Sequence, residues 1–235
     1  MKVVIPSRRR ADVLPSRALQ LFPNAVVCVA EEERDEYFRV CKNIVTHPDD
    51  VTGIGPIRQW INNHFSDELL LQVDDDCYSL GVMVGQRARR ISHPDDVMAV
   101  TRQVGECARE AGAKIFGFNQ ALDVRKFSPL KPFSFNSWVG GVIGFVGREV
   151  QYDTTLKLRA DIDACLSSLL KHRIVFVDLR FSFAQKRFEG KGGNAVNRSS
   201  EQHHRELAYL KRKWGSHLIV RQTKTTTRLV VNVER

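Results

Sequence analysis

The sequence lacks the features of membrane-spanning and disulfide-stabilised proteins. No apolar run approaches the ~18 residues that a helix needs to cross a bilayer. The apolar stretch from Met1 to Pro6 is too short for a secretory signal, and a serine and three arginines follow it. The five cysteines are scattered, and no two of them form a C-x-x-C pair. These absences argue against a disulfide framework or a zinc site and predict reduced thiols in a cytoplasmic protein.

Internal repeats, linkers and low-complexity tracts are also absent. A chain of 235 residues is long enough for one large α/β domain with a full core. Its hydrophobic content of 43% and charged content of 27% are ordinary for a soluble globular protein. One domain is therefore the simplest division.

An excess of either charge is missing until the last quarter of the chain. The formal net charge is +9. Residues 180–235 contain 13 Lys/Arg and 4 Asp/Glu, whereas the first 179 residues contain 23 of each kind. This asymmetry favours a polyanionic partner, nucleic acid ahead of an anionic membrane. A basic surface that only keeps the protein soluble would have the same composition.

Strands and helices alternate in the first third of the chain. Short apolar runs predict strands at 2–5, 25–30, 43–46 and 69–73. Helices are expected at 15–22 and 31–41, and a third has an apolar stripe from 57 to 65. Such alternation implies a parallel sheet with right-handed crossovers. A dinucleotide-binding Rossmann domain is disfavoured because no G-x-G-x-x-G follows the first strand.

Three consecutive carboxylates end the fourth predicted strand. The apolar run from Leu69 to Val73 reads as a buried parallel strand, and Asp74, Asp75 and Asp76 follow it. Open α/β sheets bind ligands at the carboxyl ends of their strands. Hard oxygen ligands select Mg²⁺ or Mn²⁺, and Mg²⁺ is typically held by one or two carboxylates together with substrate phosphates. The triplet therefore predicts a metal that grips a diphosphate, and a solvated acidic turn is the alternative.

The second part of the chain has a different pattern. Helices are expected at 94–111, at 158–172 and from a capping box at Ser199 and Gln202 to Trp214. Extended segments are expected at 114–118, 138–147, 173–178 and 181–183, and a terminal hairpin at 218–221 and 228–233. The segment 138–147 contains four glycines, which indicate close approach of a ligand or the crossing of a tight sheet.

A second acidic pair lies at the start of the helix predicted at 158–172. Asp161 and Asp163 could complement the helix dipole, or act as a general base and a group that orients the acceptor. The sequence does not identify a third protein ligand for a metal. His172, His203 and His204 are candidates, and the alternative is that they are exposed helix residues.

The order of these parts resembles the GT-A glycosyltransferases, whose nucleotide-sugar half ends in an Asp-x-Asp metal site. More closely, the chain is similar to the TET/JBP-associated glycosyltransferases of phages and kinetoplastids, which transfer sugars to 5-hydroxymethylpyrimidines in DNA. The similarity covers nearly the whole chain. It rests on residues 5–8, 57–61, 73–76 and 161–163, the Gly192-Gly193 loop and Trp214-Gly215. Ala160 stands where the family's acidic motif on this helix has a leading Glu.

The resemblance implies a role for each candidate residue on the donor side. Asp74 and Asp76 would hold Mn²⁺ or Mg²⁺ on the diphosphate of a UDP-sugar, and Asp75 would lie near the ribose or sugar. Pro6, Ser7 and Arg8 would lie against the nucleotide. Arg58, near a helix N-terminus, would face an anionic donor group, or would be an exposed surface arginine. In an inverting hexosyltransferase Asp161 would be the base, with Asp163 beside it.

The resemblance also implies the domain plan and the acceptor. Residues 1–235 would form a single GT-A-like α/β domain with a mixed central sheet, divided into a Rossmann-like nucleotide-sugar half (1–80) and an acceptor half (81–235). A base inside a duplex cannot reach a buried site, so DNA would be bound with the base flipped or as a single strand. Phosphate contacts are expected from the basic region 180–235, through Lys186, Arg187, Lys191, Arg198, Lys211, Arg212 and Lys213. A phage enzyme would act in the host-cell cytoplasm.

Other functions remain open on sequence alone. The acceptor could be a glycan, a lipid or a small molecule. A metal-dependent nuclease would use the same carboxylates and basic region, and a DNA-binding module could keep the fold without catalysis. A nucleotidyltransferase is disfavoured because no G-x-G-x-R-like loop follows the first strand. The sugar, the modified base, the stereochemistry and the oligomeric state are not determined by the sequence.

Overall fold

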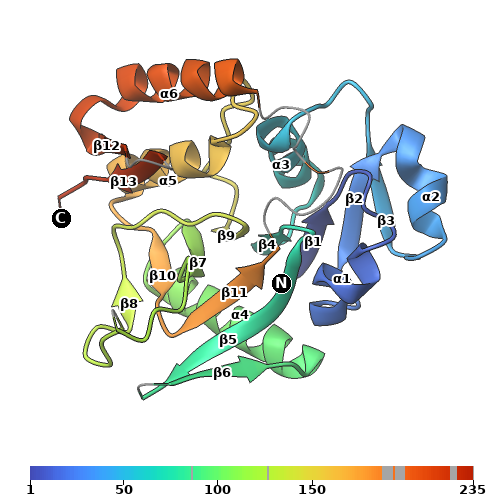
Figure 1. The fold of residues 1–235 in the computed structure, drawn as a ribbon, viewed down its shortest axis with the longest axis horizontal. Coiled ribbons are helices and arrows are strands. Elements are labelled where there is room, and N and C mark those ends of the chain that lie inside the picture. Colours follow the sequence, from blue (N-terminus) through green and yellow to red (C-terminus); the bar gives the residue numbers. More distant parts are fainter. Residues whose placement is uncertain (86, 126, 187–192, 194–198, 223–226, 235) are drawn as a thin grey trace.

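The structure, a computed structural model, describes residues 1–85, 87–125, 127–186, 193, 199–222 and 227–234. In these residues the main sheet has eight strands in the order β3-β2-β1-β4-β9-β7-β10-β8 (Figure 1). The strands are β1 (Lys2–Pro6), β2 (Val26–Ala30), β3 (Ile44–His47), β4 (Leu69–Val73), β7 (Ile115–Phe118), β8 (Phe133–Ser134), β9 (Val142–Val146) and β10 (Phe176–Asp178).

The first four strands form the predicted parallel half of this sheet. β1 pairs in parallel with β2 and β4, and β2 pairs in parallel with β3. All residues of β2 and β4 are buried, as continuous apolar runs predict. The helices expected at 15–22 and 31–41 are shorter and divided, into η1 (Leu14–Ser16) and α1 (Ala18–Leu21), and into η2 (Glu31–Glu33) and α2 (Arg34–Phe38). The third helix, α3 (Ile54–His64), forms where its apolar stripe predicts. Arg17 has a non-helical backbone and separates η1 from α1.

An antiparallel strand makes the sheet mixed. β9 lies between β4 and β7 and runs antiparallel to both. Gly144 of β9 faces the ring of Phe116, where a Cβ atom would overlap the ring carbons, so the sheet packing accounts for this glycine. The predicted fold class, α/β with a mixed central sheet, is confirmed.

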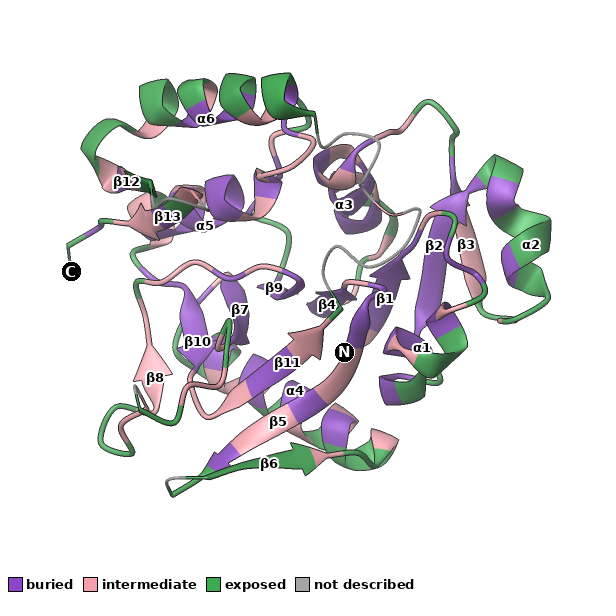
Figure 2. Cartoon of the chain, in the orientation of Figure 1, coloured by how far each residue is buried: buried purple, intermediate pink, exposed green. Residues whose placement is uncertain are grey.

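Helices cover both faces of the sheet. α4 (Pro94–Glu110) packs with α1 on one face, where Val97 and Val104 join the core around β1 and β4. α3 and α5 (Ala160–His172) pack on the other face, where Ile61 and Leu166 join a second core. Figure 2 shows the buried sheet between these partly exposed helices. Of the helices in the described residues, none is long and apolar enough to cross a bilayer.

A second, three-stranded sheet extends away from the first and was not predicted. Its order is β11-β5-β6, with β5 (Cys77–Val84), β6 (Arg87–Ile91) and β11 (Phe181–Gln185), all antiparallel (Figure 1). β6 has charged side chains on both faces and lacks the apolar alternation that identifies a strand in a sequence. Because β5 begins directly after Asp76, this sheet starts at the acidic triplet.

The carboxyl-terminal elements lie over α5. α6 (Ser200–Trp214) begins as the capping box predicts, since the Ser199 hydroxyl accepts a 3.0 Å bond from the backbone N–H of Gln202. Leu207 and Leu210 bury the inner side of α6 in the second core. After η4 (Gly215–His217), β12 (Leu218–Gln222) and β13 (Thr227–Val231) form the predicted antiparallel hairpin.

Candidate functional site

A cavity of about 760 Å³ opens at the carboxyl ends of β1 and β4. Polar residues, Ser7 and Asp74, directly follow the two strands there, as expected for the ligand-binding edge of an open α/β sheet. The cavity wall includes eight of the nine predicted catalytic and donor-binding residues: Pro6, Ser7, Arg8, Arg58, Asp74, Asp75, Asp76 and Asp161. Residues from the first strand, the triplet and α5, distant in sequence, therefore share one site.

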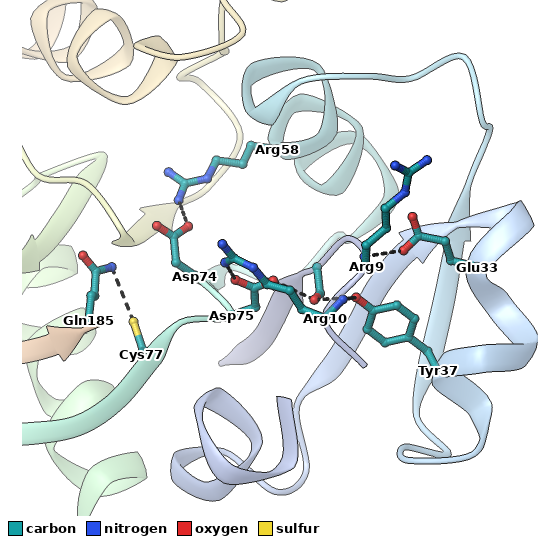
Figure 3. Close-up of polar contacts among 10 residues, drawn as sticks. Arg9, Arg10, Glu33, Tyr37, Arg58, Asp74, Asp75, Cys77 and Gln185 are labelled. Carbon is teal, nitrogen blue, oxygen red and sulfur yellow. Dashed lines mark hydrogen bonds and ion pairs between the residues drawn. The ribbon is translucent and has the colours of Figure 1, made fainter. Parts of the chain in front are cut away.

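Arg58 and Asp74 form an ion pair in this wall. Arg58 Nη2 donates to Asp74 Oδ1 over 2.6 Å (Figure 3). The Arg58 side chain is 3% exposed and that of Asp74 is 33% exposed. Burial lowers the pKa of Arg58, but the charge of Asp74, the smaller effects of Tyr152 and Asp161 and the hydrogen bond to Asp74 together outweigh burial, so the net pKa is raised. Arg58 is therefore a buried site cation and not a surface arginine.

Both carboxylate oxygens of Asp75 accept hydrogen bonds from side chains of the protein. Its Oδ1 accepts a 2.6 Å bond from Arg10 Nη1, and its Oδ2 accepts a 2.7 Å bond from the Ser7 hydroxyl (Figure 3). The Tyr37 hydroxyl lies 2.8 Å from the Ser7 hydroxyl and accepts the backbone N–H of Arg10. Burial raises the pKa of Asp75 although Arg10 opposes this. Asp75, predicted near the ribose or sugar, lines the cavity and also ties the loop after β1 to the triplet.

Gly193, from the carboxyl-terminal part of the chain, contacts the same loop after β1. Its N–H donates to the Arg8 carbonyl over 2.7 Å. Its φ is +59°, and a Cβ atom there would lie 2.8 Å from Arg10 Cζ. The left-handed backbone and the close guanidinium both favour glycine at this position. The predicted glycine loop thus contacts the first-strand loop at Gly193, while Gly192 lies outside the described residues.

Asp161 reaches the cavity from the first turn of α5. It lies against Gly140, where a Cβ atom would overlap Asp161 Oδ2. This contact accounts for one glycine of the segment 138–147 by close approach of a side chain. Burial raises the pKa of Asp161, Arg58 lowers it, and Asp74 raises it. The Asp161 carboxylate is therefore more basic than an ordinary aspartate and electrostatically coupled to the Arg58–Asp74 pair.

Asp163 points away from the cavity. It is 2% exposed, and its carboxylate accepts a 2.8 Å bond from Trp214 Nε1 and a 2.9 Å ion pair from Lys213 Nζ. Residues two apart on a helix do not share a face, so Asp161 and Asp163 point in different directions. Asp163 therefore joins α5 to α6, and the structure does not bring it to the predicted catalytic site.

Lys213, one of the predicted DNA contacts, is already paired with carboxylates of the protein. Its ammonium bonds Asp153 over 2.9 Å in addition to Asp163, and its side chain is 31% exposed. Among the other predicted DNA contacts, Lys211 and Arg212 are exposed on α6. Lys186 follows β11 next to the triplet, with its backbone N–H bonded to the Asp76 carbonyl. Arg187, Lys191 and Arg198 lie outside the described residues.

Arg159, to which the sequence assigned no role, and His203 also line the cavity. Arg159 Nη2 lies 2.7 Å from His203 Nε2. Burial, followed by the charge of Arg159, lowers the pKa of His203, which favours a neutral imidazole. Of the three histidines considered as metal ligands, His203 alone is in this wall; His172 and His204 are not.

Arg10 was also missed, although a signal for it existed. It is the last of three arginines directly after the first strand, at the edge where ligands bind. Its side chain is 10% exposed, and its guanidinium is bonded to Asp75. A basic run at that position could have been interpreted as the counter-charge of the acidic triplet.

The donor set fits a hard divalent cation. Asp74 and Asp76 provide carboxylate oxygens in the cavity wall, the ligand type that Mg²⁺ and Mn²⁺ prefer. Within the described ranges, no three His, Cys, Asp or Glu side chains converge as a complete metal site. A cation here would therefore complete its coordination with substrate oxygens, the usual situation for Mg²⁺ beside phosphates.

Solved structures with this architecture share little sequence with the chain. Mannosyl-3-phosphoglycerate synthase from Rubrobacter xylanophilus is 14% identical, with 100% of this chain and 84% of that chain covered and a TM-score of 0.51. The mannosyltransferase PcManGT from Pyrobaculum calidifontis, in complex with GDP-Man and Mn²⁺, is 11% identical, with 80% and 57% covered and a TM-score of 0.51. These similarities concern the fold, which is that of the GT-A glycosyltransferases.

A similarity to TarS of S. aureus, residues 1–349, is weaker: 13% identity, 78% and 59% covered, TM-score 0.49. The chain thus spans less than two thirds of that protein. Among curated protein sequences, none matches the chain. The family model described as TET-associated glycosyltransferase matches residues 1–194. With this match over most of its length, and with the fold and cavity described above, the chain belongs to the TET-associated glycosyltransferase family.

Proposed function

We propose that this glycosyltransferase moves a sugar from a nucleotide sugar, a UDP-sugar, to the hydroxymethyl group of a 5-hydroxymethylpyrimidine in DNA. The observation that carries the proposal is the joint presence of two acidic groups in one cavity. Asp74 and Asp76 come from the end of β4, and Asp161 comes from α5, with Arg58 close to both groups. This arrangement suits a reaction with an anionic leaving group on one side and a hydroxyl nucleophile on the other.

The donor side is assigned to the end of β4 and the loop after β1. Asp74 and Asp76 would hold Mn²⁺ or Mg²⁺, which when bound supplies Lewis-acid stabilisation of the charge that develops on the diphosphate. The mannosyltransferase from Pyrobaculum calidifontis was solved with a nucleotide sugar and Mn²⁺, in keeping with this assignment. Pro6 and Arg8 would contact the nucleotide, and the Asp75–Arg10–Ser7 network would keep their loop in place.

The acceptor side is assigned to Asp161. In an inverting transfer its carboxylate takes the proton of the acceptor hydroxymethyl group while that oxygen forms a bond to the anomeric carbon. The bond from that carbon to the diphosphate breaks, and its electron pair leaves with the nucleotide. Burial raises the pKa of Asp161, which makes its carboxylate a stronger base. In a retaining transfer the same carboxylate would orient the hydroxyl.

The DNA acceptor is supported by the family and by charge. The family description associates these glycosyltransferases with TET. The net charge of +9, concentrated in the last quarter of the chain, suits a polyanionic substrate.

Transfer can be tested directly. The protein is incubated with Mn²⁺, a panel of nucleotide sugars, and DNA containing 5-hydroxymethylcytosine or 5-hydroxymethyluracil, and the digested nucleosides are weighed by mass spectrometry. We expect a sugar-sized mass gain on one modified base and no gain on unmodified DNA. The absence of a gain with every donor and base would overturn the proposal, and strand cleavage would instead indicate a nuclease.

A further inference from the structure

Strand β6 presents a basic edge to solvent. Arg87, Arg89 and Arg90 are all exposed, and Ala88 between them is exposed as well. β6 is an edge strand of the three-stranded sheet, paired with β5 alone (Figure 1). Because side chains alternate along a strand, Arg87 and Arg89 lie on one face and Arg90 lies on the other. Within the residues that the structure describes, this strand is basic on both faces.

In the described part of the chain, these arginines differ from Arg10 and Arg58 in having no acidic partner. Arg10 and Arg58 are each paired with an aspartate of the triplet at 2.6 Å. In the described part of the chain, no ion pair involves Arg87, Arg89 or Arg90. Among the described residues, the one hydrogen bond that their side chains make is from Arg90 Nη2 to the Tyr78 carbonyl, at 3.3 Å. Their positive charge is therefore available to an external anion.

The basic edge is connected to the cavity by β5. This strand starts at Cys77, next to the cavity residue Asp76, and pairs Gly81 with Arg90 and Val84 with Arg87. At ~3.3 Å per residue, Arg90 lies roughly 17 Å along the strand from the triplet, and Arg87 roughly 26 Å. Lys186 lies near the start of this path, with its ammonium 5.9 Å from the ring of Tyr78.

We propose that β6 binds the sugar–phosphate backbone of the acceptor DNA, about five to eight base pairs from the base that receives the sugar. The spacing follows from the distances along β5 and the ~3.4 Å rise of a DNA base pair. Arginine is suited to the role because its guanidinium binds phosphate oxygens in a bidentate manner. Contacts of this kind position DNA without reading its sequence. The inference rests on the proposed function and adds a binding surface outside the region 180–235.

The test compares two variants of equal charge change. R87Q/R89Q/R90Q neutralises the β6 edge, and R34Q/R39Q/K42Q neutralises three exposed cations on and just after α2, which packs beside β3 at the other end of the main sheet. Binding of a duplex of about 24 base pairs, with one central 5-hydroxymethylpyrimidine, is followed by fluorescence anisotropy between about 50 and 200 mM salt. Melting temperatures verify that both variants are folded.

We expect the β6 variant to bind DNA at least about tenfold more weakly at the lowest salt concentration. The slope of log affinity against log salt should also fall in magnitude by about 2 to 3, because each lost phosphate contact removes ~0.9 from the slope. The α2 variant should keep the slope of the unmodified protein. A duplex with fewer than about five base pairs on either side of the target should bind both proteins equally, because it does not reach β6.

Equal affinity and slope for the β6 variant and the unmodified protein would overturn the inference. So would aggregation of the β6 variant with unchanged DNA binding, because the arginines would then serve only to protect a sheet edge. Sugar transfer to DNA is measured separately on the unmodified protein. A failure of that assay would count against the proposed function, whereas the salt slope continues to report whether β6 binds nucleic acid.

Discussion

The two acidic segments of the molecule, residues 74–76 and 161–163, each contain a carboxylate that lines the cavity and a buried carboxylate that is bonded to a cation from another part of the chain. In the first segment Asp74, 33% exposed and paired with Arg58, lines the cavity, as Asp75 and Asp76 also do, and in the second segment Asp161 lines it. In each segment another is held by the protein's own cation: Asp75 by Arg10, and Asp163 by Lys213. Neighbouring carboxylates therefore serve different purposes, one available for chemistry and one joining separate elements of the fold.

The difference lies in what surrounds each carboxylate. Asp75 and Asp163 are buried and accept bonds from neutral donors as well, the Ser7 hydroxyl and the Trp214 indole. Buried charges are tolerated when they are paired and hydrogen-bonded in this manner. Substitutions at the cavity-facing positions should accordingly reduce transfer, whereas substitutions at the bonded positions should reduce stability.

The largest effect is expected for Asp74→Asn. Loss of this carboxylate should lower the rate of sugar transfer by at least about 10²-fold, since the stabilisation of the leaving diphosphate is lost. Transfer kinetics at saturating Mn²⁺ measure the effect. Asp95→Asn, at an exposed position on α4, is the matched control. A variant at position 74 with the rate of that control would remove the donor role assigned to Asp74.

Asp75→Asn should primarily destabilise the protein. The substitution removes the carboxylate that pairs with Arg10, whose side chain is only 10% exposed. Loss of one partner of a buried ion pair typically costs about 3–5 kcal/mol of unfolding free energy. Urea denaturation followed by circular dichroism measures the loss. If Asp75→Asn were as stable as the unmodified protein, the network that ties the first-strand loop to the triplet would have no structural importance.

A smaller loss of stability is expected for Asp163→Leu. The substitution leaves the Trp214 N–H and the Lys213 ammonium without this acceptor, at a cost of about 1–3 kcal/mol. Lys213 retains Asp153, which limits the effect. The same denaturation experiment applies, with Asp96→Leu on the exposed side of α4 as a control. No difference between the two variants would contradict the joining of α5 to α6 by Asp163.

The pH dependence of transfer should report Asp161. A base acts in its deprotonated form, so the rate in an inverting reaction should rise with pH through the pKa of Asp161. Burial raises this pKa above the usual aspartate value, and the acidic limb of the profile should therefore lie at higher pH than for an ordinary aspartate. The profile of kcat/KM for the free enzyme measures it. A rate that is constant through this range would exclude Asp161 as the base.

Much of the fold could be predicted because strand burial and helix capping are local. The apolar run from Leu69 to Val73 and the capping box at Ser199 each specify their element without reference to distant residues. β5 and β6 were missed for the converse reason. The arginines of β6 give no apolar pattern, and the strand forms because β5 offers it a partner.

The site was predictable to the extent that chain position determines it. Parallel strands end at one edge, so the triplet and the loop after β1 could be expected to meet. The orientation of Asp163 could not be predicted, because it depends on Lys213 and Trp214, about fifty residues away on α6. The pairing of Arg10 with Asp75 could not be predicted either, because the two residues come from segments that are distant in the sequence.

The most direct test of this division is a side-by-side measurement of sugar transfer to hydroxymethylated DNA by Asp161→Asn and Asp163→Asn. The account predicts that Asp161→Asn transfers at least about 10²-fold more slowly while remaining folded, because the acceptor proton has no base. Asp163→Asn should transfer within a few fold of the unmodified protein and unfold at lower urea. The opposite result, with Asp163→Asn inactive and Asp161→Asn active, would contradict the assignment of chemistry to the cavity-facing aspartate.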